Sequence, residues 1–343
     1  MTIDPGLLLA GVMVVALNAY ALLGGADFGG GVWDLLASGK TADAQRATIA
    51  RTIAPVWEAN HVWLIIVVTI LFNAFPAAFA RMSVELHIPI ALALLGIVLR
   101  GSAFAFRAYG PSTRGYLRTW SIVFASASTI TPLLLGAIVG ALTEGRFAPA
   151  TATFSERYVA PWLTPFALAN GLFALVLFAY LAAVYLTLEA RERATVEAFR
   201  TRALGSGVLA AALAVAILVL SRPLPEVGDR LLRSPWGGPI QITAAVLATA
   251  TFLLLWRDKF VWARVTAALQ VSLILWGWAL AQYPYLVRPD LTVAGAAAPR
   301  NVLVILLWIL AAGALVLGPA LVYLFTVFRP AHASKPAAGI GPS

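Results

Sequence analysis

"WLTPFALANGLFALVLFAYLAAVYLT", residues 162–187, contains no charged side chain, and it decides the class of fold. A helix needs about 20 apolar residues to cross the hydrocarbon layer of a membrane, which is about 30 Å thick. Nine segments of this kind can be marked along the chain. Their approximate limits are 6–31, 52–76, 82–106, 118–142, 162–187, 204–221, 238–256, 261–281 and 302–326. Backbone polar groups in lipid must find partners within the protein, so these long runs are expected to be helices and not strands of a barrel.

The composition agrees with this interpretation. Hydrophobic residues make up 61% of the 343 residues, charged residues make up 11%, and the mean hydropathy is +0.88. A soluble fold could not cover so much apolar surface. We therefore expect an all-α polytopic membrane protein with a single transmembrane domain over 1–328. The tail 329–343 is rich in Pro and Gly and is expected to be disordered.

Two further features of the composition bear on chemistry and processing. The chain has no cysteine, which excludes disulfides, thiolate haem ligands and iron–sulfur clusters. The first residues, "MTIDPG", lack the basic leader of a secretory signal peptide, so the first helix is expected to be retained. The connections 143–161, 222–237 and 282–301 contain Pro, Gly and mixed charges and are expected to be external loops or short surface helices.

The net charge of +9 could suggest nucleic acid as a partner, but the positions of the basic residues favour a membrane surface. Fifteen of the 24 Lys and Arg residues lie in alternate connections and in the tail, the other side carries eight, and Arg100 lies within a span. This asymmetry predicts that the richer connections are cytoplasmic, which puts the N-terminus outside and the C-terminus in the cytoplasm. Membrane lipid, and no nucleic acid, is the expected partner of the basic tail.

Four ionisable residues lie within the expected spans: Asp27, Glu58, His61 and Arg100. Each such group costs roughly 2.5–3.5 kcal/mol on insertion scales, so each needs a function, a partner or access to water. The topology places Asp27 about 6 Å, and Glu58 and Arg100 about 9 Å, from the inner ends of their helices. Two acids and one arginine are thus expected in a single layer on the cytoplasmic side.

Two interpretations of this layer are compatible with each other. Arg100 could pair with Glu58 or Asp27 and tie three helices together. Alternatively, the acids could form a proton path. Burial raises the pKa of a carboxyl group and a neighbouring Arg lowers it, and the balance lets the group take up and release protons. Glu58 and His61 are three residues apart and share one face of their helix with the amide of Asn60 nearby.

The histidines argue against haem binding by this chain alone. There are three: His332 is in the tail, and His87 is expected at the outer end of the third span, far in depth from His61. Ligation of one haem by two of them is therefore not expected.

The stretch "GGADFGGGVWDLL", residues 24–36, lacks the glycine spacing and the strand-to-helix context of a phosphate loop. Gly25 and Gly29 are four residues apart, a spacing that allows close helix contact in lipid. We expect this contact to keep Asp27 away from lipid. Trp63 lies about 16 Å into the second span, near the middle of the bilayer, where packing in the core is the default expectation.

Three motifs together resemble subunit II of the cytochrome bd-type quinol oxidases. They are "GGADFGGGVWDLL", "IAPVWEANHVWLI" (53–65) and "LRGSAFAFR" (99–107), at the ends of the first three spans, and "LTPFALANGLFAL" (163–175) adds support. The resemblance implies two four-helix bundles and one peripheral helix. It also implies an obligate heterodimer with subunit I, which holds the b-type and d-type haems and oxidises quinol while dioxygen is reduced to water. No haem is implied for this chain, and the implied location is the bacterial cytoplasmic (inner) membrane, which the chain crosses several times.

The resemblance also assigns roles to residues. Asp27 and Glu58, with Asn60 and His61 beside them, match the proposed proton route of the family. Trp63 matches a tryptophan beside a proposed oxygen entrance. A further set is expected to pair charges or to support the haem interface: Arg100, Arg107 and Trp57. The resemblance leaves room for a small single-helix accessory subunit and for a structural quinone or lipid.

One position departs from the family pattern. Many members have an acid between the two phenylalanines of the third motif, where this chain has Ala105, so a proton path would have to use Glu58, His61 or water instead. Two other classes compete with the oxidase interpretation. A proton-coupled secondary transporter would also keep buried acids, but it often shows broken helices in both halves. A purely structural scaffold would not need two acids at matched depth.

Overall fold

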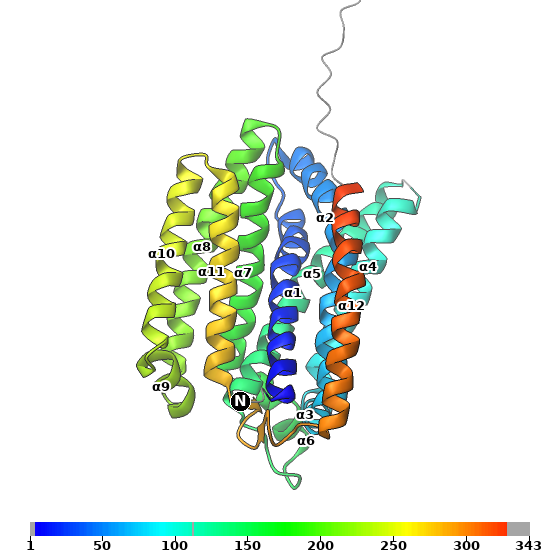
Figure 1. Ribbon diagram of the computed structural model, residues 1–343. Helices are drawn as coiled ribbons and strands as arrows, with labels where there is room; N and C mark the ends of the chain where they lie inside the picture. The colour runs from blue at the N-terminus through cyan, green and yellow to red at the C-terminus, as the bar shows by residue number, and fades with distance from the viewer. Residues whose placement is uncertain (1–3, 112, 328–343) are drawn as a thin grey trace, which may run out of the picture.

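The computed structural model describes residues 4–111 and 113–327, with the exception of the side chains of residues 53–59, 108, 225 and 324–327 (Figure 1). The predicted disordered tail, residues 329–343, lies outside the described residues. Long helices dominate the described part. They are α1 (Pro5–Leu35), α2 (Ala42–Ala74), α4 (His87–Tyr109), α5 (Arg114–Glu144), α7 (Pro165–Glu189), α8 (Arg193–Leu220), α10 (Gly237–Trp256), α11 (Phe260–Gln282) and α12 (Arg300–Val327).

The helices have the length and hydropathy of membrane spans. Within the described residues, eight are long and apolar enough to cross a membrane, and α2 with the short α3 (Pro76–Glu85) makes a ninth candidate if the pair is one span. The apolar part of α2 and the whole of α3 meet at an angle of 114°. The prediction of a polytopic helical protein with about nine spans is therefore confirmed.

The long helices form two groups of four that pack side by side (Figure 1). The first contains α1, α2, α4 and α5, and the second contains α7, α8, α10 and α11. Helix α7 lies between the groups and contacts both α1 and α5. Helix α12 packs at the periphery against α1 and α2. Because α7 is surrounded by protein, its sequence is apolar on every side, as the uninterrupted run 162–187 indicated.

The shorter elements gather at the end of the molecule that carries the N-terminus, the lower end in Figure 1. They are α3, α6 (Phe154–Tyr158), the 3-10 helix η1 (Ala160–Trp162), α9 (Pro225–Arg233) and an antiparallel hairpin of β1 (Tyr285–Val287) and β2 (Leu291–Thr292). Helices α6 and α9 match the expected short surface helices in 143–161 and 222–237. The hairpin in 282–301 was not predicted. The opposite end carries the α1–α2, α7–α8 and α10–α11 connections (Figure 1).

Three expected helix starts were wrong, for two reasons. The second and sixth spans were expected to begin at 52 and 204, but α2 begins at Ala42 and α8 at Arg193, because polar residues extend each helix beyond its apolar part. The third span was expected from 82, but α4 begins at His87, after the bend into α3. The bend lies at Phe75, which has a non-helical backbone (φ −134°, ψ 59°), because the proline that follows it disfavours the helical conformation.

Candidate functional site: a buried ion pair beside a small cavity

Close contact between α1 and α7 sets the rotation of α1. A Cβ atom on Gly25 would lie 2.5 Å from the Leu181 side chain, and one on Gly29 would lie 2.0 Å from the backbone oxygen of Phe178. No side chain fits at either position, which confirms that these glycines serve close packing. Asp27, two residues from each, is fully buried.

The Asp27 carboxylate forms a buried ion pair with Arg100 of α4, whose side chain is 1% exposed. Arg100 Nη1 donates to Asp27 Oδ2 at 2.9 Å, and Nη2 donates both to Oδ1 and, at 2.9 Å, to the Asp27 backbone oxygen. Asp27 is one of the two acids that the sequence offered as partners of Arg100, and the side chain of the other, Glu58, lies outside those described. The two-pronged geometry is the strongest that Arg and a carboxylate make.

Further groups complete the surroundings of the guanidinium. Arg100 Nε donates to Ser128 Oγ of α5 at 3.1 Å. The guanidinium carbon lies 4.9 Å from the ring centres of both Phe28 and Phe124, within the range of cation–π attraction. From α2, Asn60 Nδ2 donates to Asp27 Oδ2 at 3.4 Å, and the Asn60 side chain is fully buried. One ion pair thus joins all four helices of the first bundle.

A second ion pair lies one layer nearer the end of the bundle. Arg107 Nη1 donates to Asp34 Oδ2 at 3.0 Å, and its guanidinium carbon lies 5.1 Å from the ring centre of Phe124, so Phe124 lies between the two arginines. Asp34 is seven residues after Asp27, which places it on the same face of α1 and about 10 Å away along the axis.

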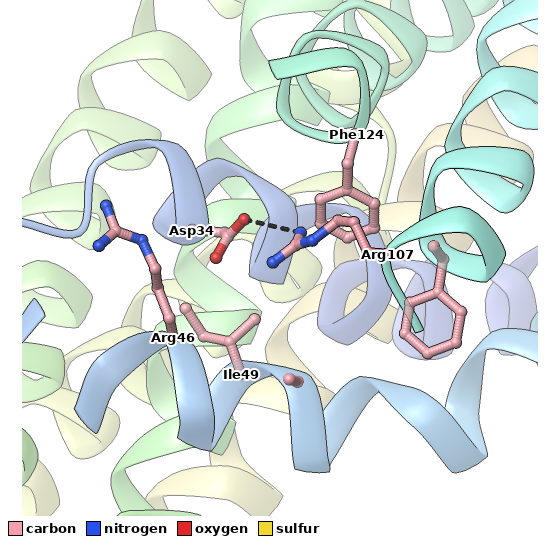
Figure 2. A pocket seen from close by; sticks show the side chains of 7 residues that line it. Asp34, Arg46, Ile49, Arg107 and Phe124 are labelled. Carbon is pink, nitrogen blue, oxygen red and sulfur yellow. Dashed lines mark hydrogen bonds and ion pairs between the residues drawn. The ribbon is translucent and has the colours of Figure 1, made fainter. Parts of the chain in front are cut away.

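Asp34 and Arg107 line a cavity of about 310 Å³ at this end of the first bundle (Figure 2). Its remaining lining residues come from α2, α4 and α5, and they are Arg46, Ile49, Ala50, Phe104 and Phe124. The Arg46 side chain is 45% exposed and that of Arg107 is 25% exposed, whereas that of Asp34 is 5% exposed. The cavity therefore connects a carboxylate that is almost fully buried with arginines that reach the surface.

Not all residues singled out from the sequence join this site. The side chains of Trp57 and Glu58 lie outside those described. His61 and Trp63 are half-buried on α2, and Trp63 packs against the cluster that contains Tyr20 and Phe28. Its Nε1 has no hydrogen-bond partner among the described residues.

The two histidines among the described residues, His61 and His87, lie on different helices. His87 is the first residue of α4, and its ring packs edge-on against Tyr158. His61 is on α2, and His332 lies outside the described residues. Among the described residues, no group of three or more His, Asp or Glu side chains is placed to hold a metal ion.

Three contributors to the site were missed in the sequence. Asp34 could have been found, because a spacing of seven residues from Asp27 marks the same helix face. Ser128 and Phe124 gave no signal, since a serine and a phenylalanine are ordinary residues in a span. Their importance depends on how α5 is rotated against α4, which local sequence does not determine.

Comparison with known proteins identifies the family of this chain. Residues 6–328 match the protein family described as cytochrome bd terminal oxidase subunit II. The chain belongs to this family. It is 26% identical over 321 residues to cytochrome bd-I ubiquinol oxidase subunit 2 of Escherichia coli (strain K12), covering 84% of this chain and 82% of the relative. Over 134 residues, 39% of each chain, it is 31% identical to cytochrome bd ubiquinol oxidase subunit 2 of Bacillus subtilis (strain 168).

A solved structure gives the same result for the fold. This subunit II superimposes on a chain of the bd oxidase from Geobacillus thermodenitrificans with a TM-score of 0.77 and 22% sequence identity, covering 96% of this chain and 99% of the other. The bd oxidase fold predicted from the motifs is therefore confirmed. Family membership also decides against the transporter and scaffold alternatives: the chain is a multi-pass membrane subunit of a bacterial respiratory oxidase complex.

Proposed function

We propose that this chain is the non-haem subunit II of a quinol:dioxygen oxidoreductase, and that it gives protons access to haems held by subunit I. In this proposal the partner binds b-type and d-type haems, oxidises quinol and reduces dioxygen to water, and the two chains form an obligate heterodimer. The relatives named as ubiquinol oxidase subunits support the reaction class. The single observation that carries the proton role is the buried Asp27–Arg100 pair, two helical turns from the cavity at Asp34.

The proposed path begins in the cavity. Protons reach Asp34 there through water beside Arg107 and the exposed Arg46. Asp27 lies about 10 Å deeper on the same face of α1, and Asn60 connects it to α2, which also carries Glu58 and His61. The amide oxygen of Asn60 has no partner among the described residues, so it can accept one more hydrogen bond. This path does not need an acid at Ala105.

The Arg100 contacts also support a structural role for the same pair. With its oxygens already accepting bonds from Arg100 and Asn60, Asp27 is held in one position. The pair thereby fixes α4 against α1 and keeps Asp27 in place on the proposed path between Asp34 and Glu58. On α2, Trp63 is half-buried near mid-bilayer, and we propose that it lines the path by which dioxygen enters from lipid. Arg107 and Trp57 are proposed to support the interface with the haem subunit.

The proton role is tested in the purified two-subunit complex with Glu58→Gln and Asp27→Asn. The reduced enzyme is mixed with oxygen, and proton uptake is followed with a pH dye while haem spectra follow electron transfer. Proton uptake linked to oxygen reduction is expected to fall by about 10²-fold, a usual contribution of a positioned proton-transfer group. The matched control is Asp229→Asn, because Asp229 is an exposed acid on α9 at the opposite end of the molecule.

The outcomes separate the two roles. A slow variant with a full haem spectrum supports proton transfer. Loss of haem absorbance at unchanged turnover per haem would show that the residue supports the haem pocket only. Turnover equal to that of the control, with both haems present, would rule out the proton route.

The proposed orientation places the end that carries the cavity in the cytoplasm. The chain contains no cysteine, so a single introduced thiol can be labelled without background. We expect Ser38→Cys, in the α1–α2 connection, to resist a membrane-impermeant maleimide in intact cells, and Ser155→Cys, in α6, to react. Both positions are exposed. The reverse pattern would place the cavity outside and would contradict proton uptake from the cytoplasm.

A further inference from the structure

The turn between α10 and α11 has a fixed backbone with an unusual residue at its centre. Asp258 N donates to the backbone oxygen of Leu255 at 3.3 Å, and Lys259 N donates to that of Leu254 at 2.8 Å. This is the pattern of a Schellman motif, in which the residue after the C-cap adopts the left-handed conformation and is usually glycine. Asp258 is the only residue other than glycine with a positive φ (56°) among the described residues.

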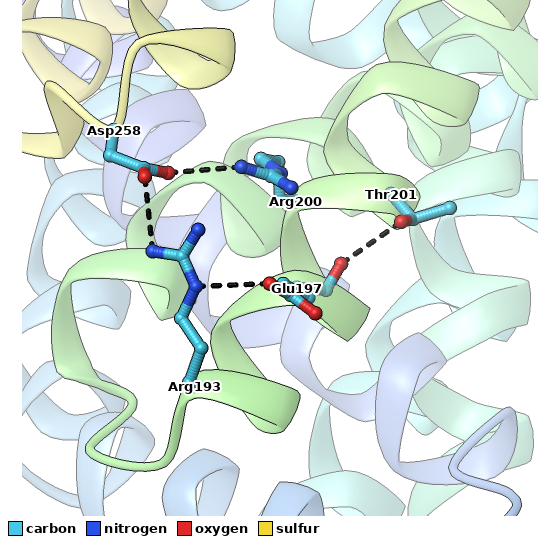
Figure 3. Close-up of polar contacts among 5 residues, drawn as sticks. All are labelled: Arg193, Glu197, Arg200, Thr201 and Asp258. Carbon is cyan, nitrogen blue, oxygen red and sulfur yellow. Dashed lines mark hydrogen bonds and ion pairs between the residues drawn. The ribbon is translucent and has the colours of Figure 1, made fainter.

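The aspartate is used here because its carboxylate holds the turn to α8 (Figure 3). Arg193 Nη1 donates to Asp258 Oδ2 at 3.0 Å, and Arg200 Nη1 donates to Oδ1 at 2.9 Å. The hydrogen bond from Arg193 and the charges of both arginines hold the pKa of Asp258 below its usual range. The negative charge of the turn is therefore fully matched by α8.

The two cationic side chains next to Asp258 have no ion-pair partner among the described residues. Arg257 and Lys259, on either side of Asp258, are exposed, and no ion pair joins either to an acid among the described residues. Nearby acids are already paired: Glu189 with Arg264 at 3.5 Å, and Glu197 with Arg193 at 2.9 Å. Glu192 is offset by the adjacent Arg191. The turn thus presents two free positive charges on a rigid backbone.

Two tryptophans bracket these charges. Trp256 ends α10 and is 77% exposed, and Trp262, in the first turn of α11, is 63% exposed. The exposed apolar side chains of both helices continue from them towards the middle of the bundle, among them Leu253 and Val265. Exposed indoles beside apolar helix surfaces settle at the level of the lipid headgroups, so the free cations lie at the same level.

We propose that the α10–α11 turn, residues 256–262, is a binding site for the headgroup of an anionic phospholipid. The phosphate lies between Arg257 and Lys259, the two indoles contact the glycerol backbone and the first methylene groups, and the acyl chains lie on the apolar faces of α10 and α11. The clamp on Asp258 keeps its carboxylate away from the phosphate. This site is remote from the proton route in the first bundle and does not depend on it.

The test uses the purified two-subunit complex, stripped of lipid in detergent and titrated with phosphatidylglycerol or phosphatidylcholine. Native mass spectrometry counts the lipids that remain bound. Arg257→Gln with Lys259→Gln is expected to weaken phosphatidylglycerol binding at its tightest site about thirtyfold, which corresponds to about 1 kcal/mol for each cation near an anionic surface. Binding of phosphatidylcholine should not change. Trp256→Leu alone should weaken both lipids, because the indole contact does not depend on headgroup charge.

The matched control is Arg114→Gln with Arg118→Gln. It removes two exposed cations from the beginning of α5, which lies at the same end of the molecule. This control should retain tight phosphatidylglycerol binding. If phosphatidylglycerol binding weakened equally in both double variants, the effect would come from general surface charge, and the proposed site would be ruled out. Displacement of the lipid by millimolar inorganic phosphate, or failure of the complex to assemble when Arg257 and Lys259 are replaced, would also overturn it.

Discussion

The Asp27–Arg100 pair predicts an asymmetric response to removal of either charge. Replacing one partner of a buried ion pair costs about 3–5 kcal/mol, because the other charge is left without compensation. After Asp27→Asn, Arg100 keeps the hydrogen bonds to Ser128 and to the backbone oxygen of residue 27, and it keeps the rings of Phe28 and Phe124. The expected cost is therefore near the lower limit, about 3 kcal/mol.

The opposite variant should be worse. After Arg100→Gln, the Asp27 carboxylate keeps only the long bond from Asn60, at 3.4 Å, so we expect a cost near the upper limit, about 5 kcal/mol. The double variant contains two neutral amides that can bond to each other. It should cost less than either single variant, about 2 kcal/mol or less, because no buried charge remains.

The assay is unfolding of the purified complex in mixed micelles of rising dodecyl sulfate content, followed by tryptophan fluorescence, with oxygen consumption measured in parallel. Recovery of stability without recovery of proton uptake in the double variant would separate the structural role of the pair from proton transfer. The reasoning would be refuted if the double variant lost as much stability as the two single variants together. It would also be refuted if Asp27→Asn lost more stability than Arg100→Gln.

Three further predictions concern packing and electrostatics elsewhere in the chain. Gly29→Ala should prevent α1 from reaching α7 and lower the yield of assembled complex, whereas Gly205→Ala on α8, where a Cβ meets nothing within 4 Å, should stabilise by about 0.5–1 kcal/mol in thermal unfolding. Trp33→Phe should lower the midpoint of thermal unfolding, because it removes the 2.7 Å hydrogen bond from Trp33 Nε1 to the Ala179 backbone oxygen of α7, at a cost of about 0.5–1.5 kcal/mol. The lowered pKa of Asp258 means that its ion pair with Arg193 stabilises above the ordinary aspartate pKa and is lost as the pH falls through the folded value. The hydrogen-exchange protection factors of the α10–α11 turn, which allow for the intrinsic pH dependence of exchange, should therefore fall on acidification, and Asp258→Asn should remove that dependence.

Hydropathy predicted most of the fold because lipid imposes a simple rule. A run such as 238–256 has to be a helix of membrane length, and α10 spans Gly237–Trp256. The rule does not apply outside lipid. It gave no sign that α2 continues back to Ala42, because polar residues 42–51 are helical for reasons that hydropathy does not measure. It also gave no sign of the hairpin in 282–301.

The sequence predicted how deep in the membrane the site residues lie, but not the direction in which each side chain points from its helix axis. Counting residues from the helix ends placed Asp27, Glu58 and Arg100 in one layer, and Asp27 and Arg100 do meet. Counting could not choose between the two acids, because the choice depends on how each helix is rotated about its axis. For α4 and α5, that rotation is set by contacts with other helices. Ser128 therefore remained invisible until the helices were packed.

For α1, however, the sequence does indicate how the helix is rotated about its axis. Successive residues of a helix turn by about 100°, so Asp27 is about 200° from both Gly25 and Gly29. Because the two glycines must face α7, the acid between them must point away from α7, towards α2 and α4, where Asn60 and Arg100 lie. Asp34, seven residues later, returns to within about 20° of the same direction and lines the cavity. The glycine pair thus does more than permit close packing: it aims both acids of α1 into the interior of the first bundle, and a side chain at either glycine would move the ion pair and the cavity together.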